Sequence, residues 1–159
     1  MRRWLLLATA GALALASCSS SNGSGSESVF SVKPGQCFTT PTTVKAELSS
    51  LQRVSCTTPH TQEAYASVAF QPSAAAVASG APTGDSAFPG ADVLTAFAKG
   101  ACAQRFGGYV GIDYLDSSLF FTYLLPSARS WEQDDDHTVL CFVTTTGGTL
   151  NASVRNSRK

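Results

Sequence analysis

Apolar and polar residues alternate along two stretches of the chain, with the period of two that is typical of half-buried strands. In EAYASVAF, residues 63–70, the even-numbered positions are all apolar, and a proline follows at position 72. In HTVLCFVTTT, residues 137–146, the alternation places Cys141 on the same side as the neighbouring valines. Both stretches are predicted to be strands of an antiparallel sheet.

Shorter strand signals lie near the start of the chain. VFSVKPGQCFTT, residues 29–40, predicts a short strand, a Pro-Gly turn and a second strand through Cys37. LQRVSC, residues 51–56, predicts a further strand.

Two more strands are predicted in the second half of the chain. SLFFTYLLP, residues 118–126, is almost continuously apolar, which favours a central strand. The glycine pair at 147 and 148 predicts a hairpin turn into a last strand over residues 149–154.

The clearest helix is predicted from position 94 onward, because apolar residues recur there at helical spacing. We expect Gly107 and Gly108 to end its regular part. Residues 71–90 consist largely of Ala, Ser, Gly and Pro, which predicts a surface loop. Together these elements predict an α+β fold: a mainly antiparallel sheet with one principal helix packed on it. The buried stripe of that helix is expected to contain Leu94, Phe97, Ala98, Ala101, Cys102, Phe106 and Tyr109.

The N-terminus has the features of an export signal. Residues 1–17 combine two arginines, an apolar run too short to span a bilayer, and small residues before Cys18. The sequence LASC, residues 15–18, resembles the bacterial lipobox, in which the cysteine is acylated and becomes the new N-terminus. Residues 18–28 are rich in Gly and Ser, so we expect a lipidated cysteine followed by a flexible tether.

Four cysteines remain after Cys18, and an exported domain with an even number of cysteines indicates disulfides. Three pairings are possible, and spacing alone does not choose among them. We favour Cys37 with Cys56 and Cys102 with Cys141, because each bridge would then join neighbouring elements. No CxxC spacing indicates a zinc site.

Charge excludes one class of partner. The 11 basic and 11 acidic residues balance, and removal of the signal leaves a formal charge of about −2, which gives no argument for nucleic acid. The basic cluster Arg155, Arg158 and Lys159 is expected to be a frayed, solvated tail.

The stretch VSCTTPHTQEAY contains the most reactive residue types. His60 and Glu63 could bind a metal, with a third ligand from residues 134–136 or from His137. We favour a structural role, in which Cys56 is paired, His60 bonds to loop backbone, and Glu63 satisfies exposed amides at the strand entrance. Partner recognition, metal binding and catalysis remain alternatives.

Other candidate chemistry is weaker. The run DDDH, residues 134–137, lacks calcium-loop spacing and is expected to be a solvated turn. No G-x-S-x-G or S-x-x-K motif indicates a nucleophile. We expect Trp131 to cover the core, with a ligand platform as the alternative.

The order of these motifs resembles the septum formation-related domain of exported proteins in high-GC Gram-positive bacteria. The resemblance covers residues 32–154 and implies a domain over residues 29–156. One loop departs from the pattern: Asp135 stands in the place of a glycine and His137 in the place of an arginine. The matching positions are Gly35, Cys37, Phe38, Val54, Cys56, Pro59, His60, Glu63, Cys102, Phe106, Tyr109, Val110, Gly111, Pro126, Trp131 and Cys141.

The resemblance implies a link to division or envelope processes and brings no reaction or cofactor. We therefore expect a non-enzymatic, lipid-anchored protein on the outer face of the cell membrane, without a cofactor, that binds an envelope protein or wall component. His60, Glu63, Trp131 and His137 are the candidate binding residues. The alternative is a metal-dependent or hydrolytic enzyme using His60 and Glu63.

Overall fold

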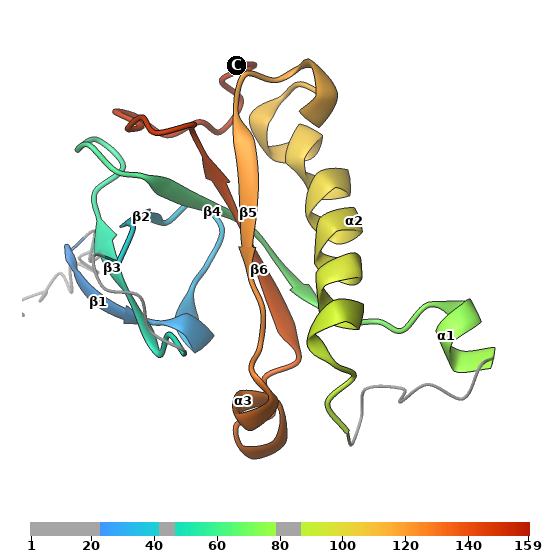
Figure 1. Cartoon of the computed structure of the whole chain (residues 1–159). Coiled ribbons are helices and arrows are strands. Elements are labelled where there is room, and N and C mark those ends of the chain that lie inside the picture. The colour runs from blue at the N-terminus through green and yellow to red at the C-terminus, as the bar shows by residue number, and fades with distance from the viewer. Residues whose placement is uncertain (1–22, 42–46, 79–86) are drawn as a thin grey trace, which may run out of the picture.

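A computed structural model of the chain describes residues 23–41, 47–78 and 87–159. These residues form an antiparallel sheet with the strand order β1-β3-β2-β4-β6-β5 (Figure 1). The signal segment 1–17 and Cys18 lie outside the described residues, so their prediction stays a prediction. The strands are β1 (Gly25–Ser28), β2 (Cys37–Thr39), β3 (Ser50–Val54), β4 (Gln62–Ala69), β5 (Phe120–Leu124) and β6 (Thr138–Thr144).

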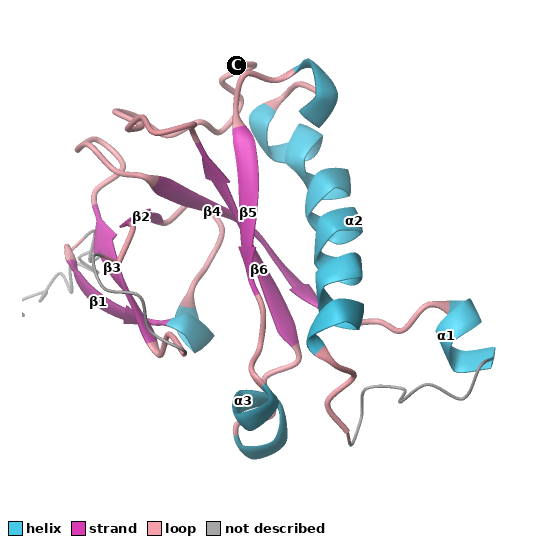
Figure 2. Cartoon of the chain, viewed as in Figure 1, coloured by secondary structure: helices cyan, strands magenta, loops and turns pink. Residues whose placement is uncertain are grey.

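One long helix, α2 (Ala91–Val110), packs against one face of the sheet (Figure 2). The predicted α+β class, with one principal helix on an antiparallel sheet, is therefore confirmed. The short helices are α1 (Ala74–Ala78), α3 (Ala128–Gln133) and two 3-10 turns, η1 (Val29–Ser31) and η2 (Tyr114–Asp116).

The main core lies between α2 and the sheet. Six of the seven positions in the predicted helical stripe are buried, and Phe97 is partly buried. The Cys102–Cys141 disulfide joins α2 to β6 in this core, and the Cys37–Cys56 disulfide joins β2 to the turn after β3, so both favoured pairings are present. Two disulfides indicate an extracytoplasmic domain. Within the described ranges, no helix combines the length and apolar character needed to cross a bilayer.

A second, smaller core lies on the opposite face of the sheet. It contains Val32, Phe38, Leu51, Ala64, Leu140 and Phe142. A β-bulge between Ala64 and Ala66 shifts the register of β4. Because of this bulge, Ala64 faces the smaller core while Tyr65 and Ala66 both face the main core, so the strict alternation predicted for this strand is wrong.

Several predicted boundaries differ in the structure. The tether is shorter than expected, because Gly25–Ser28 pair with β3 as an edge strand, and the short strand expected next is the turn η1. The loop at 71–90 contains α1, and residues 79–86 lie outside the described ranges.

The apolar run at 118–126 was expected to be a central strand, but β5 is an edge strand. Its Phe121 packs against Tyr114 of η2, with the two ring centroids 4.7 Å apart. The last strand predicted over residues 149–154 is absent from the described fold. In its place Leu150 forms an isolated bridge with His60.

The helix α2 passes through the two glycines that were expected to end it and stops at Gly111. Gly111 has a φ of 89°, in the left-handed region that favours glycine. A Cβ added there would lie 3.2 Å from the Cγ of Arg158. The absence of a side chain at Gly111 therefore also leaves room for the C-terminal segment, residues 150–159, to pack against the end of the helix.

This C-terminal segment is not the frayed tail that its charge predicts. The amides of Asn156 and Arg158 donate to the carbonyls of Tyr109 and Val110, both at 2.9 Å. The guanidinium of Arg155 lies 4.7 Å from the centre of the Tyr109 ring. Backbone hydrogen bonds and a cation–π contact therefore hold the segment against the end of α2.

Candidate functional site

His60 and Glu63 lie together at the start of β4, and both side chains are fully buried. Two elements place them there. The backbone of His60 exchanges hydrogen bonds with Leu150 in both directions, at 2.9 and 2.7 Å. Glu63 lies opposite Cys37 in the pairing of β2 with β4. The Cys37–Cys56 disulfide closes the turn that leads to His60.

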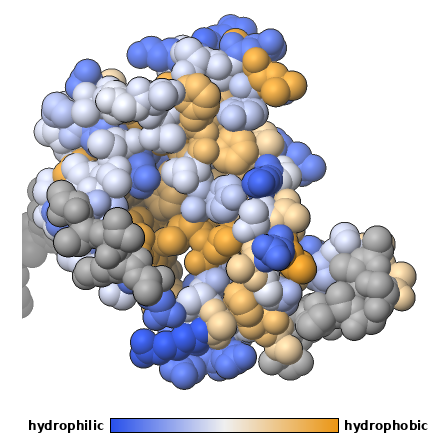
Figure 3. Space-filling model, viewed as in Figure 1, coloured by the Kyte–Doolittle hydropathy of each residue, from blue (hydrophilic) through white to orange (hydrophobic). Residues whose placement is uncertain are grey.

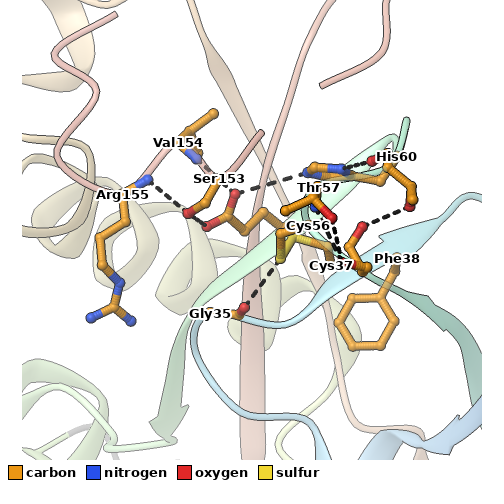
Figure 4. Close-up of a disulfide and its surroundings, with 12 residues drawn as sticks. Gly35, Cys37, Phe38, Cys56, Thr57, His60, Ser153, Val154 and Arg155 are labelled. Atoms are coloured by element: carbon orange, nitrogen blue, oxygen red, sulfur yellow. Dashed lines mark hydrogen bonds and ion pairs between the residues drawn. A yellow bond between two sulfur atoms is a disulfide. The ribbon is translucent and has the colours of Figure 1, made fainter. Parts of the chain in front are cut away.

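The Glu63 carboxylate is the centre of a hydrogen-bond network. Figure 4 labels two of its partners, Ser153 and Val154. Its Oε1 accepts from the Tyr109 hydroxyl at 2.5 Å and from the Ser153 hydroxyl at 2.6 Å. Its Oε2 accepts from the Val154 amide at 2.8 Å. Three segments that are far apart in the sequence, α2, β4 and the C-terminal segment, therefore meet at one side chain.

His60 bonds to loop backbone, as expected: its Nδ1 lies 2.8 Å from the carbonyl oxygen of Thr58. Its Nε2 lies 3.9 Å from the Glu63 Oε2, which is beyond hydrogen-bond length. The role expected for Glu63 needs correction, because the amide that it satisfies belongs to the C-terminal segment and not to the strand entrance.

Burial raises the pKa of Tyr109 to about 12, and its hydrogen bond to Glu63 acts in the same direction. The hydroxyl therefore stays protonated at neutral pH and remains a donor to the carboxylate.

Trp131 and His137 lie at the other end of the sheet. Their ring centroids are 4.1 Å apart, and Trp131 is 2% exposed, so it covers the core as expected. Because β4 spans Gln62–Ala69 at about 3.3 Å per residue, this pair lies roughly 20 Å from His60. The four candidate residues do not form one site, and residues 134–137 cannot supply the third ligand considered for His60 and Glu63.

A cavity of about 700 Å³ opens on the sheet face opposite α2. Ser67, Leu124, Leu140 and Val32 line it from the sheet and the smaller core, while η1, residues 47–49 and the α3 loop form its walls. Figure 3 shows apolar side chains in the middle of the molecule in this view, with hydrophilic side chains around them. Sequence patterns missed this site, since its residues come from five separated segments. The sequence contains one indication of the cavity: Ser67 is small and polar, in a strand where most residues are buried.

The rim of the cavity is acidic. Among the described residues, Glu47 and the three aspartates at 134–136 line it together with one cation, Arg129. The side chain of Asp135 is 95% exposed, and its φ of 54° lies in the left-handed region, consistent with the glycine expected at this place. Asp136 is half-buried and accepts from the Thr138 amide and the Ser130 hydroxyl, so it orders the loop. The predicted solvated turn therefore also borders a cavity.

The chain matches the family model for septum formation over residues 34–158. That range includes the four disulfide cysteines, His60, Glu63 and most of the cavity lining. No curated protein and no solved structure matches the chain.

We predict that Glu63→Gln lowers the free energy of unfolding by about 3 to 5 kcal/mol. The glutamine side chain has no negative charge, and its NH₂ group would face the hydroxyl and amide groups that now donate to the carboxylate. Urea denaturation monitored by tryptophan fluorescence measures the change. Glu132→Gln, on the exposed face of α3, is the matched control and should stay within about 0.5 kcal/mol of wild type. Equal stability of the two variants would contradict the central role of Glu63.

We predict that stability falls as the pH rises from 10 to 12, because the unfolded chain loses the Tyr109 proton near pH 10 while the folded chain retains it to about 12. Urea midpoints measured across this window test the slope. Tyr109→Phe should flatten the slope without abolishing it, since burial also raises the pKa of Tyr65. An unchanged slope would show that Tyr109 titrates normally.

Proposed function

The chain belongs to the septum formation family, and on this premise we propose that it is a lipid-anchored envelope protein whose extracytoplasmic domain binds a Lys- or Arg-bearing segment of another envelope protein. The two disulfides support an extracytoplasmic domain, and the lipobox at residues 15–18 supports acylation of Cys18. The cavity opposite α2 is the single observation that carries the binding role.

Size and lining suit the cavity to an anchoring side chain. Its volume of about 700 Å³ falls within the roughly 300–1,000 Å³ typical of ligand sites. Leu124 and Leu140 offer an apolar floor, and the acidic rim favours a cationic group beside the apolar anchor. A peptide that combines an apolar residue with a neighbouring Lys or Arg satisfies both features.

The free edge of β5 extends the proposed binding surface. β5 ends the strand order, and none of its five residues is buried, although most are aromatic or apolar. Phe120 is 47% exposed, and Leu124 at the other end of the strand reaches the cavity. An apolar edge strand is a template for pairing with another chain. The edge therefore supports an extended partner segment that runs into the cavity.

An enzyme that uses His60 and Glu63 has less support. Both side chains have no exposed area, and the carboxylate is occupied by three donors. A substrate would reach them only after the C-terminal segment had separated from β4. The binding role requires no such opening.

We predict that Ser67→Trp abolishes partner binding by placing an indole inside the cavity, since Ser67 lies in its lining and its side chain is exposed there. Lys99→Trp is the matched control, because Lys99 is exposed on α2, away from the cavity lining. A photo-crosslinking residue at Ser49, on the cavity wall, reports binding in cells.

Mass spectrometry of the crosslinked peptide should identify a Lys- or Arg-bearing extracytoplasmic segment. The adduct should disappear in Ser67→Trp, weaken in the double variant Asp134→Asn/Asp135→Asn, and persist in Lys99→Trp. An adduct that survives filling of the cavity, or no specific adduct at all, would refute the proposed function.

We predict that Cys18 of the mature protein carries acyl chains. Mass spectrometry of the N-terminal peptide from the membrane fraction should find Cys18 as the first residue, with the added mass of lipid. Cys18→Ser should leave the signal segment attached and unacylated. Wild-type protein recovered without lipid and with cleavage elsewhere would contradict the anchor.

A further inference from the structure

Three potential metal ligands converge at the start of β4, on the side of the sheet that the proposed binding role does not use. The Sγ of Cys37, a ring nitrogen of His60 and a carboxylate oxygen of Glu63 lie within 4.8 Å of one another, and all three residues are buried. Cys56 is bonded to Cys37, so cleavage of the disulfide would leave a second thiol next to these three residues (Figure 4).

The imidazole of His60 is oriented as a metal ligand would be. A carbonyl oxygen only accepts hydrogen bonds, so the contact with Thr58 places a proton on Nδ1. In the neutral ring Nε2 then has the lone pair. That atom is buried and makes no hydrogen bond to any described residue, which is uncommon for a buried polar atom. Metal-binding histidines use the same arrangement, with the second nitrogen bonded to a backbone carbonyl.

Glu63 is held in a matching way. Tyr109 and Ser153 donate to its Oε1, whereas its Oε2 accepts only the Val154 amide and faces the Nε2 of His60. Two acceptor atoms that face each other at 3.9 Å are both satisfied by a cation between them. Outer hydrogen bonds of this kind fix the carboxylates of metal sites.

The disulfide keeps this ligand set incomplete, because a disulfide sulfur is not a thiolate. We propose that reduction of the Cys37–Cys56 bond converts the cluster into a structural Zn²⁺ site formed by Cys37, Cys56, His60 and Glu63. A dithiol reductant supplies two electrons and two protons to the disulfide and itself becomes a disulfide. Zn²⁺ then displaces the two thiol protons and binds both thiolates.

Ligand number and type fit zinc. Two thiolates, one imidazole and one carboxylate complete a tetrahedral shell, and thiolate ligands select zinc over magnesium or calcium. With bonds of about 2.0–2.3 Å, donor atoms in such a shell lie roughly 3.3–3.8 Å apart, so the ligand atoms of Cys37, His60 and Glu63 need a contraction of about 1 to 1.5 Å at most. The Cys56 sulfur, freed from its bond to Cys37, must move apart from it to take the fourth position. The shell leaves no open position for substrate, and the site is structural.

The switch would keep the fold closed in two redox states. In the oxidised protein the disulfide joins β2 to the turn before His60. In the reduced protein the metal would join the same two segments and add β4 through Glu63. The cavity on the other face is not part of either arrangement.

Co²⁺ titration of the full-length protein in detergent tests this inference. The protein is reduced with a dithiol, freed of reductant under anaerobic conditions, and titrated with Co²⁺ as a spectroscopic probe for zinc. We expect one Co²⁺ per chain, with a thiolate charge-transfer band and the visible bands of tetrahedral cobalt, displaced by one equivalent of Zn²⁺. The oxidised protein should show neither band.

Variants separate this site from other thiols and from an unfolded chain. Cys37→Ser/Cys56→Ser should lose the charge-transfer band, His60→Ala should bind Co²⁺ roughly tenfold more weakly or worse, and Cys102→Ser/Cys141→Ser should keep the wild-type spectrum. Zn²⁺ should also raise the thermal midpoint of the reduced wild-type protein, since only the folded chain assembles the four ligands. A band that persists in Cys37→Ser/Cys56→Ser, or binding without a higher midpoint, would overturn the proposal.

Discussion

One buried carboxylate holds the ends of this domain together. Glu63 accepts hydrogen bonds from a side chain of α2 and from a side chain and an amide of the C-terminal segment, while its own backbone belongs to β4. Hydrogen bonds to a charged group are stronger than neutral ones, and a buried carboxylate without them would cost several kcal/mol. The end of α2 and the C-terminal segment therefore depend on the same interaction.

The two faces of the sheet have different structural roles. On the α2 face, the bulge in β4 turns both Tyr65 and Ala66 into the main core, and the Cys102–Cys141 disulfide joins helix to sheet. On the other face the same bulge leaves Ser67 beside Leu140, where little side-chain volume fills the space. The well-packed α2 face thus supports the face with the cavity, and a binding site is best placed on such a supported element.

The four candidate binding residues lie at two different ends of the sheet. His60 and Glu63 are sealed at one end, and Trp131 and His137 stack at the other. The acidic loop beside His137 borders the cavity, and the basic C-terminal segment covers the end of α2 near Glu63. These two oppositely charged groups are therefore separated in space, and of the two the acidic loop is the one that borders the cavity.

Local patterns in the sequence were sufficient for the fold class, the strand β6, the buried stripe of α2 and the core position of Trp131, because periodicity reports which face of a segment is buried. The cysteine count indicated disulfides, and neighbouring elements favoured the pairing that forms. Tertiary structure alone decided that β5 lies at an edge, that the C-terminal segment docks on Tyr109, and that Glu63 faces that segment. It also decided where the cavity opens. These features depend on contacts between residues that are distant in the sequence, such as Glu63 with Val154, 91 positions away. A local pattern does not specify such contacts, since it records that a side chain is buried and not which partner buries it.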